Sequence, residues 1–267
     1  MVKRLAVFNF LSVLIAITTN FFAQTGKINN TTIGEVSSKY SNLFTPADYA
    51  FSIWGLIYIG LLSFSAFMLY QAFSNGKFTD FISKTSFWFI VANIGTSLWV
   101  IAWIYEYTGL SVAIMFLILV KLLKVIFNND MEVWDAPFKV IVFYWWPICL
   151  FSGWITVASI ANMAAWLTEI GWDGAVFSEV EWTVIMITVA VIINLLMIYF
   201  RNMREFALVG VWALIAIYIR HQGTEELIAK TAMAGAILLF LNIGYHGFIN
   251  RKTNPMYRFI HGEKSRP

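Results

Sequence analysis

Aromatic side chains recur at helical spacing in three apolar stretches of this chain, with small or hydrogen-bonding residues beside them. Residues three and four apart share one face of a helix, so each stretch presents its rings on one side. Rings stack on flat apolar molecules, a small side chain leaves room for them, and hydroxyl or amide groups bind a polar edge. The chemistry indicated is therefore non-covalent binding. The residues are Phe51, Trp54 and Tyr58 in the first stretch, Thr96 and Trp99 in the second, and Trp154, Ala158 and Asn162 in the third.

The same pattern has a second interpretation, a close-packed aromatic core that binds nothing. Asn93 extends the face of the second stretch, and an amide buried in lipid needs a partner, so we expect a hydrogen bond to another helix. Pro147 is expected to kink the third stretch because it lacks a backbone N–H. Cavity and core are both compatible with the sequence.

The sequence contains no recognisable motif for covalent catalysis. It contains no HExxH motif, no Cys/His cluster, no phosphate-binding Gly-rich loop and no nucleophile elbow. Ionisable residues such as Glu106 and Glu205 fall at the ends of apolar stretches, where long side chains reach water. A proton- or ion-coupled pump is disfavoured because it needs a buried carboxylate. We therefore predict no catalytic residue, no metal site and no resident cofactor.

The composition indicates which elements position these rings. The 267 residues are 60% hydrophobic and only 12% charged, against about 25% charged in soluble domains. Stretches of about 20 apolar residues are long enough to cross a bilayer as helices. The sequence therefore predicts an all-α, polytopic membrane bundle of about eight helices. The apolar stretches are 5–23, 50–71, 84–105, 109–128, 138–165, 182–200, 205–220 and 227–248.

Positive charge is unevenly distributed over the predicted loops. With the N-terminus inside, 14 of the 18 Lys and Arg residues fall on the inner side. This bias predicts cytoplasmic N- and C-termini, with the lipid bilayer as the main partner. The basic residues are scattered rather than clustered, so no nucleic acid is expected as a partner. The outer bases are Lys27, Lys39, Arg220 and Lys230.

An acidic loop at 166–181 is the predicted boundary within the chain. It separates a Trp-rich part, 1–167, from three further helices, 168–250, and a basic cytoplasmic tail, 251–267. The first helix resembles a signal peptide, since Lys3 and Arg4 precede its apolar run. Because the large Phe21 fits a cleavage site poorly, we expect the helix to be retained.

The first two aromatic stretches match an ordered family pattern. Around Trp54 and Tyr58 the chain keeps the spacing W-x-x-x-Y, preceded by Pro46, with Phe51 one residue out of register. The next helix reads T-x-x-W where the family has N-x-x-W. This order resembles the TspO/MBR family, the tryptophan-rich sensory and translocator proteins.

The third stretch carries the rest of the resemblance. Trp154, Ala158 and Asn162 match the family's W-x-x-x-A-x-x-x-N, while Leu150 stands in place of its proline and Pro147 lies one turn earlier. After Asn162 the chain reads MAAWLTEI, without the tyrosine and base of the family's sterol pattern. The resemblance covers about residues 5–167 and is closest to long, bacterial members with extra helices.

The resemblance implies a five-helix bundle that binds a small hydrophobic, planar ligand. The implied ligand class is the tetrapyrroles, for example a porphyrin or haem-like molecule. Sensing or translocation is the implied role, and a homodimer is the implied assembly. Small residues at Ala232 and Ala236 are spaced to allow close helix packing between two copies. The alternatives are a membrane enzyme for an aromatic or isoprenoid substrate, a small-solute carrier, and an assembly factor whose rings only pack.

Overall fold

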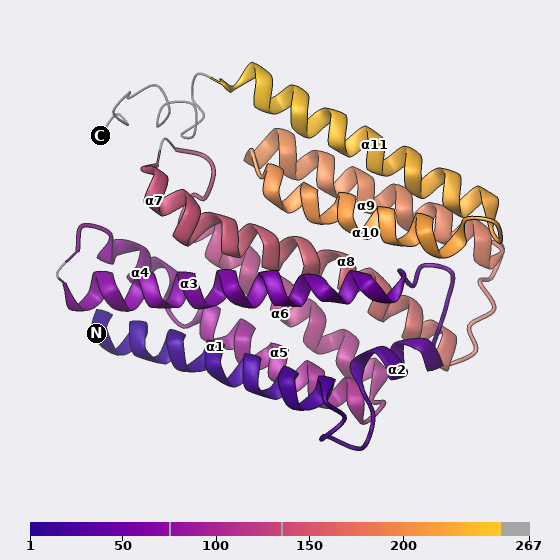
Figure 1. Ribbon diagram of the computed structural model, residues 1–267, viewed down its shortest axis with the longest axis horizontal. Coiled ribbons are helices and arrows are strands. Elements are labelled where there is room, and N and C mark those ends of the chain that lie inside the picture. Colours follow the sequence, from indigo (N-terminus) through magenta and orange to yellow (C-terminus); the bar gives the residue numbers. More distant parts are fainter. Residues whose placement is uncertain (75, 135, 252–267) are drawn as a thin grey trace.

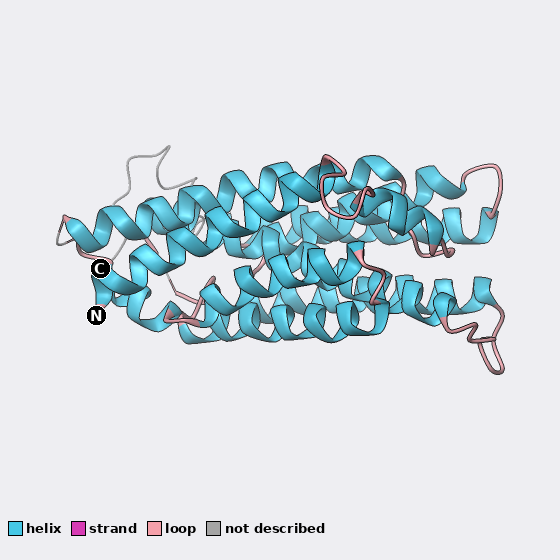
Figure 2. Cartoon of the chain, turned by 90° about the horizontal axis from the view of Figure 1, so that it is seen from below, coloured by secondary structure: helices cyan, strands magenta, loops and turns pink. Residues whose placement is uncertain are grey.

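The computed structural model describes residues 1–74, 76–134 and 136–251, which form helices and no strand. The helices run along the long axis of the molecule (Figures 1 and 2). The long ones are α1 (Val2–Gln24), α3 (Ile53–Phe73), α5 (Trp88–Ile104), α6 (Thr108–Asn128), α8 (Trp146–Glu169), α9 (Glu179–Arg201), α10 (Arg204–His221) and α11 (Glu226–Ile249). The short ones are α2 (Ile33–Lys39), η1 (Asp48–Ser52), α4 (Thr79–Thr85), α7 (Phe138–Val140) and the π-helical turn η2 (Ile141–Trp145).

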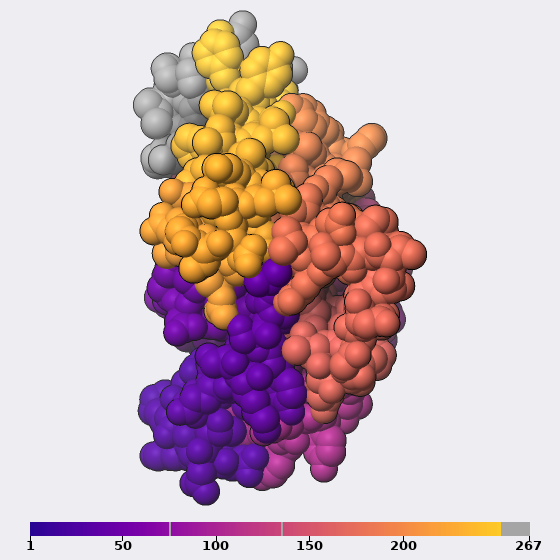
Figure 3. Space-filling view, turned by 90° about the vertical axis from the view of Figure 1, so that its right-hand side faces the viewer, coloured from indigo at the N-terminus to yellow at the C-terminus, as the bar shows by residue number. Residues whose placement is uncertain are grey.

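The two ends of the bundle differ in what covers them. We call the end where α1 begins and α11 ends the terminal end, and the opposite end the α2 end (Figure 1). Figure 3 looks onto the α2 end, where the segment between α1 and α3 lies beside the start of α9. One bond joins them, from the backbone N–H of Leu43 to a carboxylate oxygen of Glu179, at 3.3 Å.

The predicted all-α membrane bundle is confirmed, because each of the eight apolar stretches contains a long helix. Six helical segments are long and apolar enough to cross a bilayer, or up to seven if the bent pair α4 and α5 is one span. The predicted span 84–105 contains α5 and only the last two residues of α4, and the pair bends by 54° near Ser86, whose φ is +51°. The 18-residue α10 is not among these spans, since Arg204, Glu205 and Arg220 reduce its apolar length.

Helix α1 is packed into the bundle against α3 and α5. Its buried face includes Ala6, Ser12 and Val13. The amide nitrogen of Asn93 on α5 donates to the hydroxyl of Ser12 over 3.2 Å, which is the predicted hydrogen bond to another helix. Such bonds hold membrane helices in register because lipid offers no alternative partner.

The expected kink at Pro147 is replaced by a π-helical turn. Pro147 lies in the first turn of α8, directly after η2, and the helical path continues from Phe138 to Glu169. A proline ring collides with the carbonyl four residues earlier, and the wider π turn relieves that collision. On α3, Gly60 lets the chain approach closely, since a Cβ there would lie 3.3 Å from the Cβ of Pro147.

The last three helices are joined to the rest through α10, which contacts α8, α9 and α11. Side chains of α10 contribute to both clusters of buried apolar residues in the chain. At Gly153 of α8 a Cβ would lie only 2.8 Å from the carbonyl oxygen of Phe206, so glycine permits this close crossing. The loop between α8 and α9 falls within the predicted boundary, and of the predicted tail only Arg251 is among the described residues.

The small residues of α11 pack closely, as their spacing predicts, and they do so against helices of the same chain. Ala232 and Ala236 are 0% and 3% exposed, because they pack within the chain. Between them, a Cβ at Gly235 would lie 2.8 Å from Val191 on α9. The spacing therefore serves close packing of α11 inside one molecule, and the homodimer stays a prediction.

An aromatic cavity beneath a short surface helix

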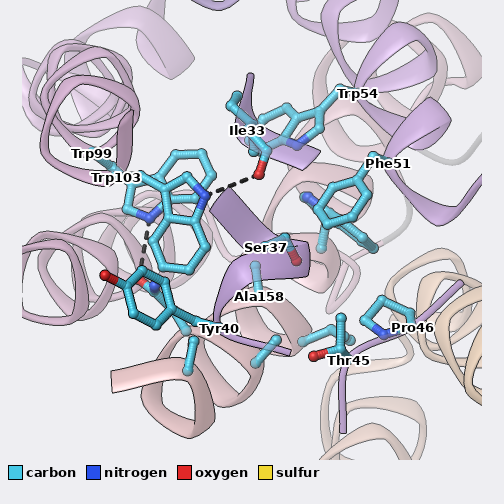
Figure 4. Close-up of a pocket in the computed structure, with 15 residues that line it drawn as sticks. Ile33, Ser37, Tyr40, Thr45, Pro46, Phe51, Trp54, Trp99, Trp103 and Ala158 are labelled. Atoms are coloured by element: carbon cyan, nitrogen blue, oxygen red, sulfur yellow. Dashed lines mark hydrogen bonds between the residues drawn. The ribbon is translucent and has the colours of Figure 1, made fainter. Parts of the chain in front are cut away.

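The predicted aromatic faces meet around one cavity near the α2 end (Figure 4). Helices α3, α5 and α8 supply its walls, and α2 with the following loop covers it. The lining residues are Ile33, Ser37, Tyr40, Thr45, Pro46, Phe51, Trp54, Trp99, Trp103, Trp154, Val157, Ala158, Ala161, Asn162 and Ala165.

Three indole rings form a row along one wall. The ring centroids of Trp54 and Trp99 are 6.3 Å apart at 26°, and those of Trp99 and Trp103 are 6.2 Å apart at 19°. Tyr58 continues the row behind Trp54, at 5.3 Å and 23°. Offset, nearly parallel rings at these distances attract one another, so the row is a rigid apolar surface.

A fourth indole closes the row at right angles. The ring of Trp154 on α8 lies 6.4 Å from that of Trp54, with an angle of 82° between the planes. Phe51 meets Trp154 in the same way, at 6.2 Å and 83°. The cavity therefore has a flat wall from α3 and α5 and an edge from α8, with the small side chain of Ala158 between them.

Hydrogen bonds fix part of this wall. The indole N–H of Trp99 and the hydroxyl of Ser111 both donate to the amide oxygen of Asn162, over 3.1 Å and 3.0 Å. The indole N–H of Trp103 donates to the backbone oxygen of Ile33 in α2, also over 3.1 Å. Asn162 thus connects α5, α6 and α8, and Trp103 connects α5 with the cover.

Other polar atoms around the cavity are buried without a partner among the described residues. These are the indole nitrogens of Trp54 and Trp154 and the amide nitrogen of Asn162, with the hydroxyl of Tyr58 next to them. A buried donor without an acceptor costs about 1–3 kcal/mol. Three of the four groups are donors only, so a molecule that offers acceptors would satisfy them.

Several specific contacts hold α2 and the following loop, the cover, over the cavity. Thr32 and Glu35 form a capping box that starts α2. At its other end, the carboxylate of Glu106 after α5 pairs with Lys39 and accepts the hydroxyl of Tyr40. Lys39, and then Tyr40, hold the pKa of Glu106 below its ordinary value. The amide of Asn29 adds a bond to the backbone oxygen of Ile104, at 3.1 Å.

The covered cavity is narrow. Its free volume is about 50 Å³, which is far below the roughly 300–1,000 Å³ of ligand pockets. The rings therefore lie close together. Ile33 and Ser37 of α2, and Tyr40 directly after it, line the side of the cavity that faces the α2 end.

Six of the eight predicted site residues line the cavity: Phe51, Trp54, Trp99, Trp154, Ala158 and Asn162. Tyr58 stacks behind Trp54 and does not reach the cavity wall. Thr96 also lies apart, since its hydroxyl donates to the backbone oxygen of Ala92 within α5. A small rotation of α5 about its axis decides this placement, and spacing alone does not determine it.

Sequence reasoning missed part of the cavity lining. Trp103 follows Trp99 by four residues, so the signal for it was present in the spacing. Tyr40 follows Ile33 and Val36 at helical spacing, but this signal is short and lies in a polar segment, and Pro46 has no such pattern around it. Their position depends on contacts with distant helices.

Comparison with known families identifies the chain. A model of the TSPO-like protein family matches residues 6–245, which include α9, α10 and most of α11 as well as the earlier helices. A search of curated proteins and a search of solved structures each found no match. The three helices beyond residue 167, which the resemblance in the sequence left unexplained, are thus part of the matched unit. The chain belongs to the TSPO-like protein family and is an integral membrane protein.

Proposed function

We propose that this protein binds a planar, mostly apolar ligand in the aromatic cavity and acts as a sensor or translocator for it. The observation that carries the proposal is the row of nearly parallel indoles beside three buried donors without partners. A ligand with acceptor groups would give these donors the partners that buried polar groups in native proteins usually have.

The chemistry of the wall favours a particular kind of ligand. Stacking on Trp54 and Trp99 suits an extended π system, and the edge near Trp154 and Asn162 suits acceptor groups such as carboxylates or carbonyls. No charged side chain lines the cavity. A tetrapyrrole with carboxylate side chains combines both features, and it is the ligand class that the family resemblance implies.

The ligand enters from the α2 end in this proposal. The anchors of the cover are one ion pair and a few hydrogen bonds, and those at Glu106 lie on the protein surface. Exposed pairs of this kind are weak, so the cost of opening the cover comes mainly from the buried side chains of Ile33 and Val36 and from the hydrogen bond of Trp103 to Ile33. Movement of α2 is then the event that a sensor transmits or a translocator uses.

The membrane placement follows the charge bias. We propose that the terminal end faces the cytoplasm of a bacterium, because most Lys and Arg residues lie on that side. The cavity would then open toward the outer face of the plasma membrane.

The test is a titration of the purified protein with protoporphyrin IX, read from the absorbance of the porphyrin. Trp54→Ala and Trp154→Ala are expected to weaken binding at least about tenfold, or about 1.4 kcal/mol. Trp172→Ala is the matched control, since this exposed indole lies outside the cavity. Affinities unchanged in both cavity variants would refute the site.

A further inference from the structure

A second group of unpaired polar atoms lies at the terminal end, where the loop after α6 meets the turn between α9 and α10. Among the described residues, one carboxylate oxygen each of Glu132 and Glu205 is buried without a partner, as is the Nε of Arg201. The expectation that Glu205 reaches water is therefore wrong for this oxygen. Neither the aromatic cavity nor the proposed ligand accounts for these atoms.

The chain holds Glu132 in place by several contacts. Its φ is +62°, a left-handed conformation that non-glycine residues rarely adopt. The amide nitrogen of Asn202 donates to the backbone oxygen of Glu132 over 2.8 Å, and Arg201 donates to that of Met131 over 3.1 Å. Strained residues persist only where surrounding contacts hold them, so this position is specified by the fold.

The positive charge near Glu132 and Glu205 does not neutralise the two carboxylates. Glu132 and Glu205 repel each other, and Arg204 is the base that attracts both. Trp146 on α8 also interacts with Glu205 and favours its charged form. None of the ion pairs among the described residues includes either carboxyl. The other titratable groups in the neighbourhood are Asp130, Cys149, Arg201 and, beyond Arg204, His246.

Two half-buried carboxylates that repel each other, each with one buried oxygen that has no partner, are unfavourable when both are ionised. A proton on one carboxyl removes the repulsion and supplies a donor where an unpaired acceptor stood. A divalent metal fits less well, because no group of three or more His, Cys, Asp or Glu ligands occurs within the described chain. We propose that Glu132 and Glu205 form a proton-binding site that joins the loop after α6 to the turn between α9 and α10.

The direction of the pKa change at Glu132 agrees with this site. Burial, and then the charge of Glu205, raise the pKa of Glu132 to about 8. Its value in the unfolded chain is about 4.3. The folded protein therefore keeps a proton that the unfolded chain releases. The stability from this group is complete below about pH 4.3 and is lost as the pH rises toward 8.

The experiment measures the thermal unfolding midpoint of the full chain in detergent, without ligand, between about pH 6 and 9. The wild type is expected to lose at least about 5 °C over this range beyond any loss that the control shares. Glu132→Gln and Glu205→Gln remove the charge with little change in shape, so each should abolish most of that fall. Asp173→Asn, which alters an exposed carboxylate at the α2 end, should leave the fall unchanged.

A second readout covers the case in which a variant fails to fold. Infrared spectra of the wild type should show a protonated carboxyl at about pH 6 that disappears by about pH 9. A fall in midpoint that persists in both Gln variants, or no protonated carboxyl at about pH 6, would overturn the proposal. So would a midpoint that depends on sodium concentration instead of pH, since that result would assign the site to a metal cation. Because no porphyrin is present, the outcome is independent of the proposed ligand.

Discussion

The two ends of this bundle both bury polar atoms without partners, but the atoms differ in kind. At the α2 end they are neutral donors on Trp54, Trp154 and Asn162, which stay donors at every physiological pH. At the terminal end they include carboxyl oxygens of Glu132 and Glu205, which can take up a proton. A neutral donor is satisfied only by an acceptor on another molecule, whereas a carboxyl pair is satisfied by a proton from water.

This difference suggests separate roles for the two ends. In our proposals the aromatic cavity binds a ligand, and the carboxyl pair binds a proton. Substitutions at one end should leave the property of the other end unchanged, and the following predictions test that separation.

The largest effect is expected for Trp54→Ala. Trp54 is 3% exposed and its ring contacts those of Tyr58, Trp99, Phe151 and Trp154. Removing a buried indole typically costs about 3–5 kcal/mol because a cavity remains. Denaturant unfolding should show this loss, while the pH dependence of the midpoint stays as in the wild type. Loss of the pH dependence together with the stability would show that the two ends are one unit.

A smaller effect is expected when the cavity is filled. Ala158→Leu adds carbon atoms to a free volume of about 50 Å³, so protoporphyrin binding should weaken about 3–10-fold. The thermal midpoint of the ligand-free protein should stay the same or rise. Val120→Leu on α6, which is 55% exposed, is the control for a larger side chain outside the cavity. Equal affinities for both variants and the wild type would place the ligand elsewhere.

The cover should affect rates more than affinity. Glu106→Gln removes the charge that holds Lys39 and weakens the bond from Tyr40, so stopped-flow mixing with protoporphyrin should show association about 2–5-fold faster. Because the pKa of Glu106 is lowered, the anchor is present at neutral pH and is lost only as the pH falls below about 4.3. Asp80→Asn, which breaks the exposed pair with Lys84, should not change the rate. An unchanged rate for Glu106→Gln would mean that α2 is not the gate.

The smallest effect is expected for Glu132→Gln on ligand binding. Glu132 lies at the opposite end of the bundle from the cavity. The affinity of the Glu132→Gln variant for protoporphyrin should therefore stay within about twofold of the wild-type affinity between pH 6 and 8. A change of more than about fivefold would show that proton binding and ligand binding are coupled.

The helices and most of the cavity wall were predictable because their signals are local. Uncharged runs indicate spans, and the four-residue spacing of Trp154, Ala158 and Asn162 places them on one face of α8. The turn of each helix about its axis is set by its neighbours, and this is why Tyr58 and Thr96 fall outside the lining.

The cover and the carboxyl pair were not predictable from these signals. Helix α2 has only seven residues, so its one apolar pair, Ile33 and Val36, and its capping box between Thr32 and Glu35 give a short signal. Glu132 and Glu205 meet only after α8 and α9 have packed, and each looks like an ordinary residue near a helix end. A contact between residues far apart in the chain produces no periodic pattern in the sequence from which it could be predicted.

The most direct test of the account is the variant Trp154→Phe, which keeps an aromatic ring and removes the unpaired indole N–H. We predict that protoporphyrin binds about 5–10-fold more weakly to this variant, because one hydrogen bond is lost, while the ligand-free midpoint changes little. An affinity equal to that of the wild type would contradict the central claim that the buried donors of the cavity serve a ligand.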